Sequence, residues 1–163
     1  MPTLSGERVA YVAEGFHDSF SKSCNEFIYH VLAVCGYAIR GLMSVRTFFP
    51  YSQLLNYGIR GLDVSQYDLE ECTIISQLPN FTRGDIVAFY RQYFRGQRVN
   101  EDIAHVMIAL RPRLLRGSNN VSLFGGSVLL RNVNLYETNT ECDFRGCVCA
   151  IPADALIHYH QRA

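Results

Sequence analysis

The chain of 163 residues has no net charge and no tryptophan, and charged residues make up only 18% of it. Fifteen basic residues balance fifteen acidic ones without a run of like charge, so the sequence predicts no nucleic-acid-binding surface. No apolar stretch reaches the roughly 20 residues that a membrane-spanning helix needs. We therefore expect no membrane insertion.

The N-terminus lacks a basic segment followed by an apolar core, which is the pattern of a secretory signal peptide. We expect synthesis in the cytoplasm and, if the protein acts elsewhere, secretion without a cleaved leader. Repeats, low-complexity segments and linkers are absent, while 48% of the residues are hydrophobic. Residues 1–163 are therefore expected to form a single domain with a substantial core.

Six cysteines are too few to serve as the framework of a chain of this length. Cys142, Cys147 and Cys149 lie close together and precede His158 and His160, so this region contains metal-ligand residue types. Zinc sites, however, usually separate paired cysteines by two residues. Buried thiols or a disulfide are the preferred interpretations, and we predict no metal or other cofactor.

Residues 23–36 carry the clearest helix pattern. Ser23 and Glu26 have capping-box spacing, and Gly36 favours a left-handed stop, which together predict a helix over 24–35. At about 100° per residue, this helix has an apolar face opposite Glu26, Tyr29, His30 and Ala33. That face contains Cys24, Phe27, Ile28, Val31, Leu32, Val34 and Cys35.

Cys24 is expected at the first position of this helix, and two interpretations are open. Unpaired backbone N–H groups and the helix dipole favour a thiolate there, which suits a nucleophile. Cysteine is also common in protein cores, where it packs as a small apolar side chain.

The remaining pattern places helices first and strands later. Helices are expected up to Gly15, from Tyr51 to Tyr57, and from Asp63 or Ser65 to Leu78. Turn-like or irregular stretches are expected at 96–100, 111–120 and 142–149. Strands are expected at 86–90, 103–110, 121–124, 128–133 and 155–160. The sequence thus predicts an α+β fold with N-terminal helices packed on a C-terminal antiparallel β-sheet.

Three blocks in this order resemble the NlpC-type cell-wall peptidases, a papain-like superfamily of cysteine amidases and endopeptidases. Residues 23–32 resemble the helix that carries the nucleophile in that family. Residues 83–89 resemble its Gly-Asp strand, and residues 104–110 resemble the strand with the catalytic histidine. The resemblance implies a papain-like fold.

The resemblance also implies residue roles, with Cys24 as nucleophile and His105 as general base. Asn120 is a candidate for the residue that orients the histidine, with Asn119 and Ser122 as alternatives. The sequence departs from the family at Ser23, where an acidic residue is usual, and at 25–26, where the family has Ser-Gly. These departures predict a differently shaped cleft.

A Gly-Gly-Ser segment at 125–127 is similar to a segment of the small amidase effectors that type VI secretion delivers. The resemblance therefore implies an antibacterial toxin that cleaves peptidoglycan stem peptides and is blocked by a cognate immunity protein. The alternative is a non-enzymatic α+β interaction protein with Cys24 in its core. Cys35, on the same helix face but far from the N-terminus, is expected to be inert in both cases.

Overall fold

A computed structural model of the chain describes residues 4–15, 24–37, 48–63, 80–94, 97–112, 114–117, 126–129 and 142–162. Residues 60–63, 89–94, 97–105, 126–129 and 142–148 are placed by their backbone alone. Within these ranges the fold is α+β, as the sequence predicts. None of the helices described has the length and apolarity that crossing a membrane requires.

Two N-terminal helices pack against each other. Helix α1 spans Leu4–Gly15 and α2 spans Cys24–Val34. The end of α2 lies beside the start of α1, where the Tyr37 hydroxyl donates a hydrogen bond to the Ser5 hydroxyl at 2.9 Å. Gly36 follows α2 with a φ of 89°, which confirms the predicted left-handed stop.

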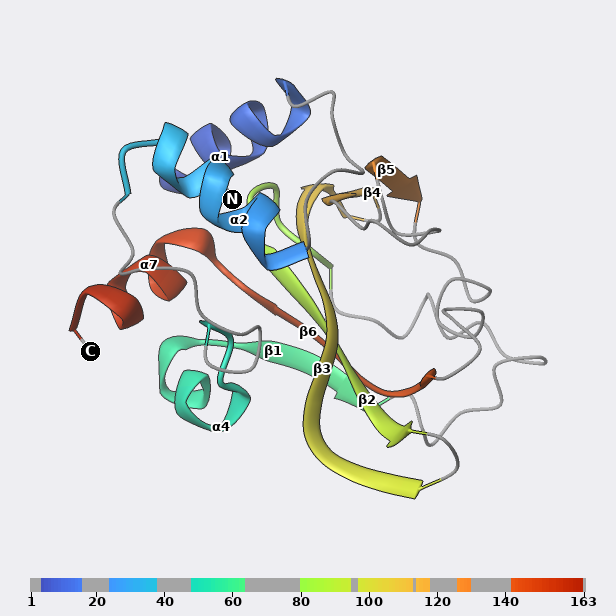
Figure 1. The fold of residues 1–163 in the computed structure, drawn as a ribbon. Helices are drawn as coiled ribbons and strands as arrows, with labels where there is room; N and C mark the ends of the chain where they lie inside the picture. Colours follow the sequence, from blue (N-terminus) through green and yellow to red (C-terminus); the bar gives the residue numbers. More distant parts are fainter. Residues whose placement is uncertain are drawn as a thin grey trace.

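A short helical segment follows, with α4 at Tyr51–Leu54 and the 3₁₀ helix η1 at Leu55–Tyr57. It covers the helix predicted from Tyr51 to Tyr57 and ends at Gly58, which has the left-handed conformation. The last helix, α7, spans Ala153–Arg162. Figure 1 shows α1, α2 and α7 gathered together against one end of the sheet.

The described strands form one six-stranded sheet in the order β1-β6-β2-β3-β4-β5, in which each strand is antiparallel to its neighbours. Strands β2 and β3 form a hairpin at its centre, and the C-terminal β6 lies between β2 and β1 (Figure 1). The strands span Arg60–Asp63 (β1), Ile86–Phe94 (β2), Gln97–Arg111 (β3), Leu114–Gly117 (β4), Gly126–Leu129 (β5) and Cys142–Ile151 (β6).

The core lies between the helices and one face of the sheet. Val106, Ile108 and Leu110 alternate along β3 and join buried residues of α1, α2 and α7 in one cluster. Met107 and Ala109, which belong to the opposite face, are also buried. The continuous apolar run of this strand follows from burial on both faces.

The Gly-Asp turn before β2 holds α1 against the sheet. Gly84 has a φ of 92°, and its Cα faces the backbone of Gly6 so closely that a Cβ would overlap it. Asp85 is buried, and its carboxylate accepts the Thr82 N–H at 2.8 Å. Glycine is needed here for both its conformation and its size.

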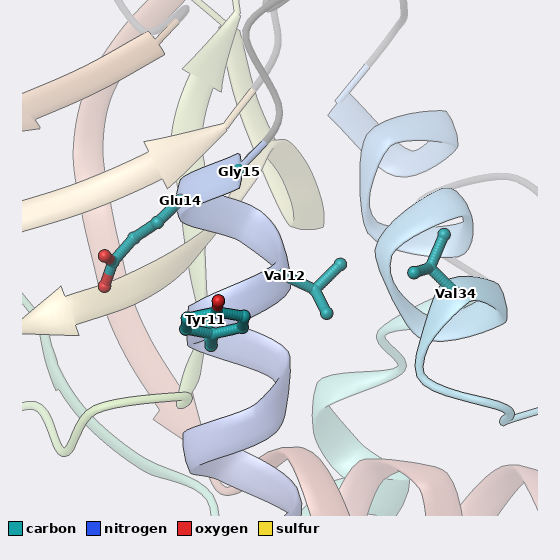
Figure 2. Close-up of a pocket in the computed structure, with 5 residues that line it drawn as sticks. All are labelled: Tyr11, Val12, Glu14, Gly15 and Val34. Atoms are coloured by element: carbon teal, nitrogen blue, oxygen red, sulfur yellow. The ribbon is translucent and has the colours of Figure 1, made fainter.

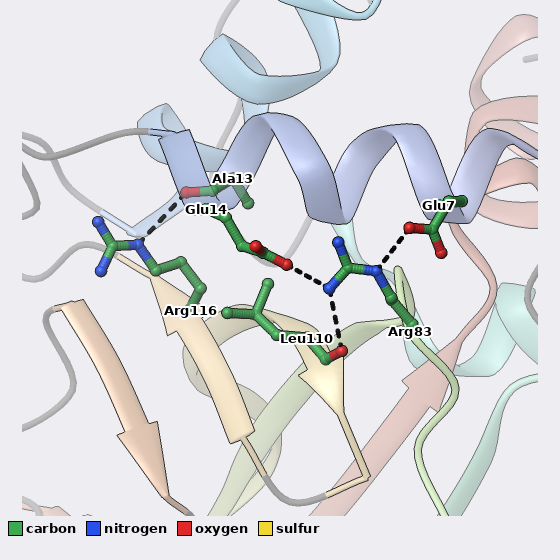
Figure 3. A network of polar contacts seen from close by, with 6 residues as sticks. All are labelled: Glu7, Ala13, Glu14, Arg83, Leu110 and Arg116. Carbon is green, nitrogen blue, oxygen red and sulfur yellow. Dashed lines mark hydrogen bonds and ion pairs between the residues drawn. The ribbon is translucent and has the colours of Figure 1, made fainter.

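Arg83, in the same turn, clamps α1 to the sheet (Figure 3). Its guanidinium pairs with Glu14 and, at 2.8 Å, with Glu7, and it donates to the Leu110 carbonyl at 3.3 Å. From β4, Arg116 donates to the Ala13 carbonyl at 3.3 Å, near the end of α1. These contacts fix the orientation of α1 rather than adding much stability, because partly exposed ion pairs contribute little.

The C-terminal third differs most from prediction. Residues 142–149 belong to strand β6 and are not irregular, and the strand predicted at 155–160 is helix α7. Ala153, Leu156 and Ile157 are buried at helical spacing, and the Leu156 N–H bonds the Pro152 carbonyl at 3.1 Å. Helical periodicity, not alternation, is therefore the pattern that decides this segment.

Two further predictions in the sheet are wrong, and one strand was missed. Residues 97–100 extend β3, residues 114–117 form β4, and β1 was not expected at 60–63. Backbone pairing with a neighbouring strand stabilises these segments, and that pairing does not show in the side-chain pattern of the segment itself. The strand predicted at 128–133 overlaps β5 at 128–129. Residues 64–78 of the helix predicted up to Leu78, the strand predicted at 121–124 and residues 130–133 lie outside the described residues.

We expect the contact that His160 of α7 makes with the Phe48 carbonyl to be sensitive to acid. Its Nε2 lies 2.7 Å from the Phe48 carbonyl, and burial lowers the pKa of this imidazole, although that hydrogen bond opposes the shift. The neutral form is favoured in the fold. Its stabilisation is therefore present above the ordinary pKa of about 6.5 and is lost as the pH falls through the lower, folded-state pKa.

We expect His160→Gln, which keeps a donor but does not titrate, to flatten the loss of stability below pH 6.5. Urea unfolding between pH 7 and pH 4.5 measures this slope. Exposed His158 of the same helix gives the matched control, His158→Gln. Equal slopes for the wild type and His160→Gln would contradict the assignment.

Candidate functional site

Cys24 is the first residue of α2, and this helix packs on β3. Its Sγ accepts hydrogen bonds from the backbone N–H groups of Val106, Asn25 and Cys24 itself. Two of these donors belong to the first turn of the helix, where backbone N–H groups have no partner within the helix. The thiol therefore lies between the N-terminus of α2 and the backbone of β3.

The pKa of Cys24 is raised above its ordinary value, because burial penalises the thiolate more than the three hydrogen bonds stabilise it. The backbone alone thus does not produce the activated thiolate expected from the sequence. A low pKa at this position requires a cationic neighbour.

The Val106 N–H can reach this sulfur because it lies on the edge of β3 that faces away from β2, which we call the outer edge. The N–H and carbonyl of Ala109 both bond to the Gly84–Asp85 turn on the β2 side, at 2.8 and 2.7 Å. Backbone groups alternate between the two edges of an antiparallel strand, so Ile108 and Val106 present theirs to the opposite edge. Ile108 pairs there with Arg116 of β4.

His105 directly precedes Val106, and its backbone lies opposite Phe89 in β2. The register shifts at this point, because Tyr90 pairs with Ile103 and leaves Ala104 as an extra residue in β3. A bulge of this kind interrupts the regular alternation of faces along a strand. The structure thus places the backbone of His105 one residue from the atom that donates to the Cys24 sulfur.

In the part of the chain that the structure describes, no other predicted site residue lies beside the Cys24 sulfur. Asn120, Asn119 and Ser122 lie outside the described residues, so the third position of the site is not placed. Cys35 is 4% exposed, and burial raises its pKa, opposed by the charge of Arg8.

The metal-ligand residue types near the C-terminus are separated by the fold. Cys149 is buried in β6, whereas His158 is exposed in α7 beside Tyr57, with ring centroids 6.0 Å apart. None of Cys24, Cys35 and Cys149 takes part in a disulfide. Across the described ranges, no three metal-ligating side chains gather in one place.

A shallow hollow of about 470 Å³ lies between α1 and α2 (Figure 2). Tyr11 and Val34 border it and are 73% and 53% exposed, so Val34 does not belong to the buried face predicted for α2. Tyr29, predicted to face outward, packs on the core with its ring 4.9 Å from Phe48. Cys24 is not among the residues that line the hollow.

Sequence reasoning missed the part played by Val106. The only available indication was its position directly after the candidate histidine, in a strand predicted correctly. A hydrogen bond from the main chain depends on strand register and on how α2 packs on β3. Neither property is encoded in the identity of residue 106.

Comparison of the chain with protein-family models, with curated proteins and with solved structures gave no match.

Proposed function

We propose that this protein is a cysteine amidase or endopeptidase of papain-like fold, which cleaves an amide bond in peptidoglycan stem peptides. The proposal rests on one observation above all. The Cys24 sulfur lies at the N-terminus of α2 and accepts the N–H of Val106, the neighbour of His105. The resemblance of the three sequence blocks to the NlpC-type peptidases supplies the substrate class.

In the first step, the Cys24 thiolate attacks the carbonyl carbon of the scissile amide, and the carbonyl electron pair moves to oxygen. The backbone N–H groups of Cys24 and Asn25 donate to the sulfur in the resting protein. As negative charge leaves the sulfur, these donors become available to the new oxyanion. The same helix end thus stabilises the charge before and after attack.

In the second step, the C–N bond breaks and His105 as imidazolium gives its proton to the leaving amine. Water then attacks the Cys24 thioester, and His105 takes one of its protons. Collapse releases the carboxylic acid product and restores the thiolate and imidazolium. The reaction consumes one water and needs no cofactor.

This mechanism requires His105 to act on the side of β3 where Cys24 lies. Regular alternation would assign residues 105 and 106 to opposite faces of the strand. The register shift at Ala104, directly before His105, is the feature that would have to redirect the imidazole, because bulges change the direction of a neighbouring side chain. An imidazolium there would also provide the cation that the buried thiol requires.

We expect Cys24 to be alkylated by iodoacetamide at pH 6 about tenfold faster in the wild type than in His105→Ala. Ion pairing to an imidazolium at His105 would lower the pKa of Cys24 and so raise the thiolate fraction at pH 6, and the lower nucleophilicity of such a thiolate removes part of that gain. In the variant, burial outweighs the main-chain hydrogen bonds to the sulfur, so the thiolate forms only at high pH. Mass spectrometry of tryptic peptides across pH 5–10 gives both profiles, with Cys35 as the internal control.

A non-enzymatic interaction protein is the second candidate, and the raised pKa of Cys24 favours it. In that case the pH profiles of Cys24 alkylation would coincide for the wild type and His105→Ala, and Cys24 would react only under alkaline conditions. The exposed Tyr11 and Val34 beside the hollow between α1 and α2 would then be the first surface to test for a partner.

Incubation with purified peptidoglycan tests the substrate class. New soluble stem-peptide fragments, detected by mass spectrometry, are the expected result, and an unchanged fragment pattern would contradict it. We further propose, from the similarity to type VI amidase effectors, that the protein acts in the bacterial periplasm or cell wall. A cognate immunity protein would block the cleft at Cys24.

A further inference from the structure

We draw no further inference here: the strongest candidate, the shallow hollow between α1 and α2 with the exposed Tyr11 and Val34 at its border, is an unpartnered surface, and nothing among the described residues shows what covers it.

Discussion

Gly84→Ala is expected to lower the free energy of unfolding by about 2–5 kcal/mol. Its φ of 92° is left-handed, which costs an L-residue roughly 1–2 kcal/mol. The new methyl group would also overlap the backbone of Gly6 in α1, and forced displacement of a packed element costs about 1–3 kcal/mol more. Backbone atoms on the other side of the contact leave no side chain that could rotate away.

Gly36→Ala separates these two contributions. Gly36 has almost the same conformation, with a φ of 89°, but no atom lies within 4 Å of the position that a Cβ would take. We expect only the conformational cost there, about 1–2 kcal/mol. Urea unfolding of both variants measures the difference, and equal losses would show that α1 does not approach Gly84 as closely as described.

The contrast between these glycines shows what the sequence can and cannot predict. Gly36 was predictable as a helix stop, because the apolar pattern of α2 ends there. The Arg-Gly-Asp-Ile block was predictable as a turn before a strand. That Gly84 faces Gly6, 78 positions away, depends on the packing of α1, which the local pattern does not contain.

Local patterns also explain which elements were predicted correctly. Helix α2 has a strong apolar periodicity with a defined end, and β2 and β3 are apolar runs that continue over both buried faces. Helix α7 and strand β6 were misjudged for one physical reason. Short segments with mixed periodicity take the structure that their neighbours permit, here pairing with β2 for β6 and packing on α1 for α7.

The candidate site shows the same contrast between what the local sequence pattern predicts and what the tertiary packing determines. The sequence located Cys24 at a helix start and His105 on a strand, because both depend on local pattern. It suggested a thiolate favoured by the helix end, whereas burial raises the pKa of Cys24 in the fold. The balance between burial and hydrogen bonding depends on how closely α2 approaches β3, which only the tertiary structure determines.

Cys24→Ala and His105→Ala are each expected to lower the rate of stem-peptide hydrolysis at least about 1,000-fold, because a nucleophile and its base act as one unit. For the same reason, the double variant should be scarcely slower than either single variant. Release of stem-peptide fragments from purified peptidoglycan, followed by mass spectrometry, measures the rates.

Cys35→Ala provides the matched control. Cys35 was predicted on the same helix face as Cys24, but it is buried just beyond the C-terminal end of α2. It should keep hydrolysis within about twofold while losing some stability, because a buried sulfur is removed. Hydrolysis that survives Cys24→Ala would rule out the nucleophile. Hydrolysis lost in Cys24→Ala but kept in His105→Ala would require a different base, and the bulge at Ala104 would then have no part in the chemistry.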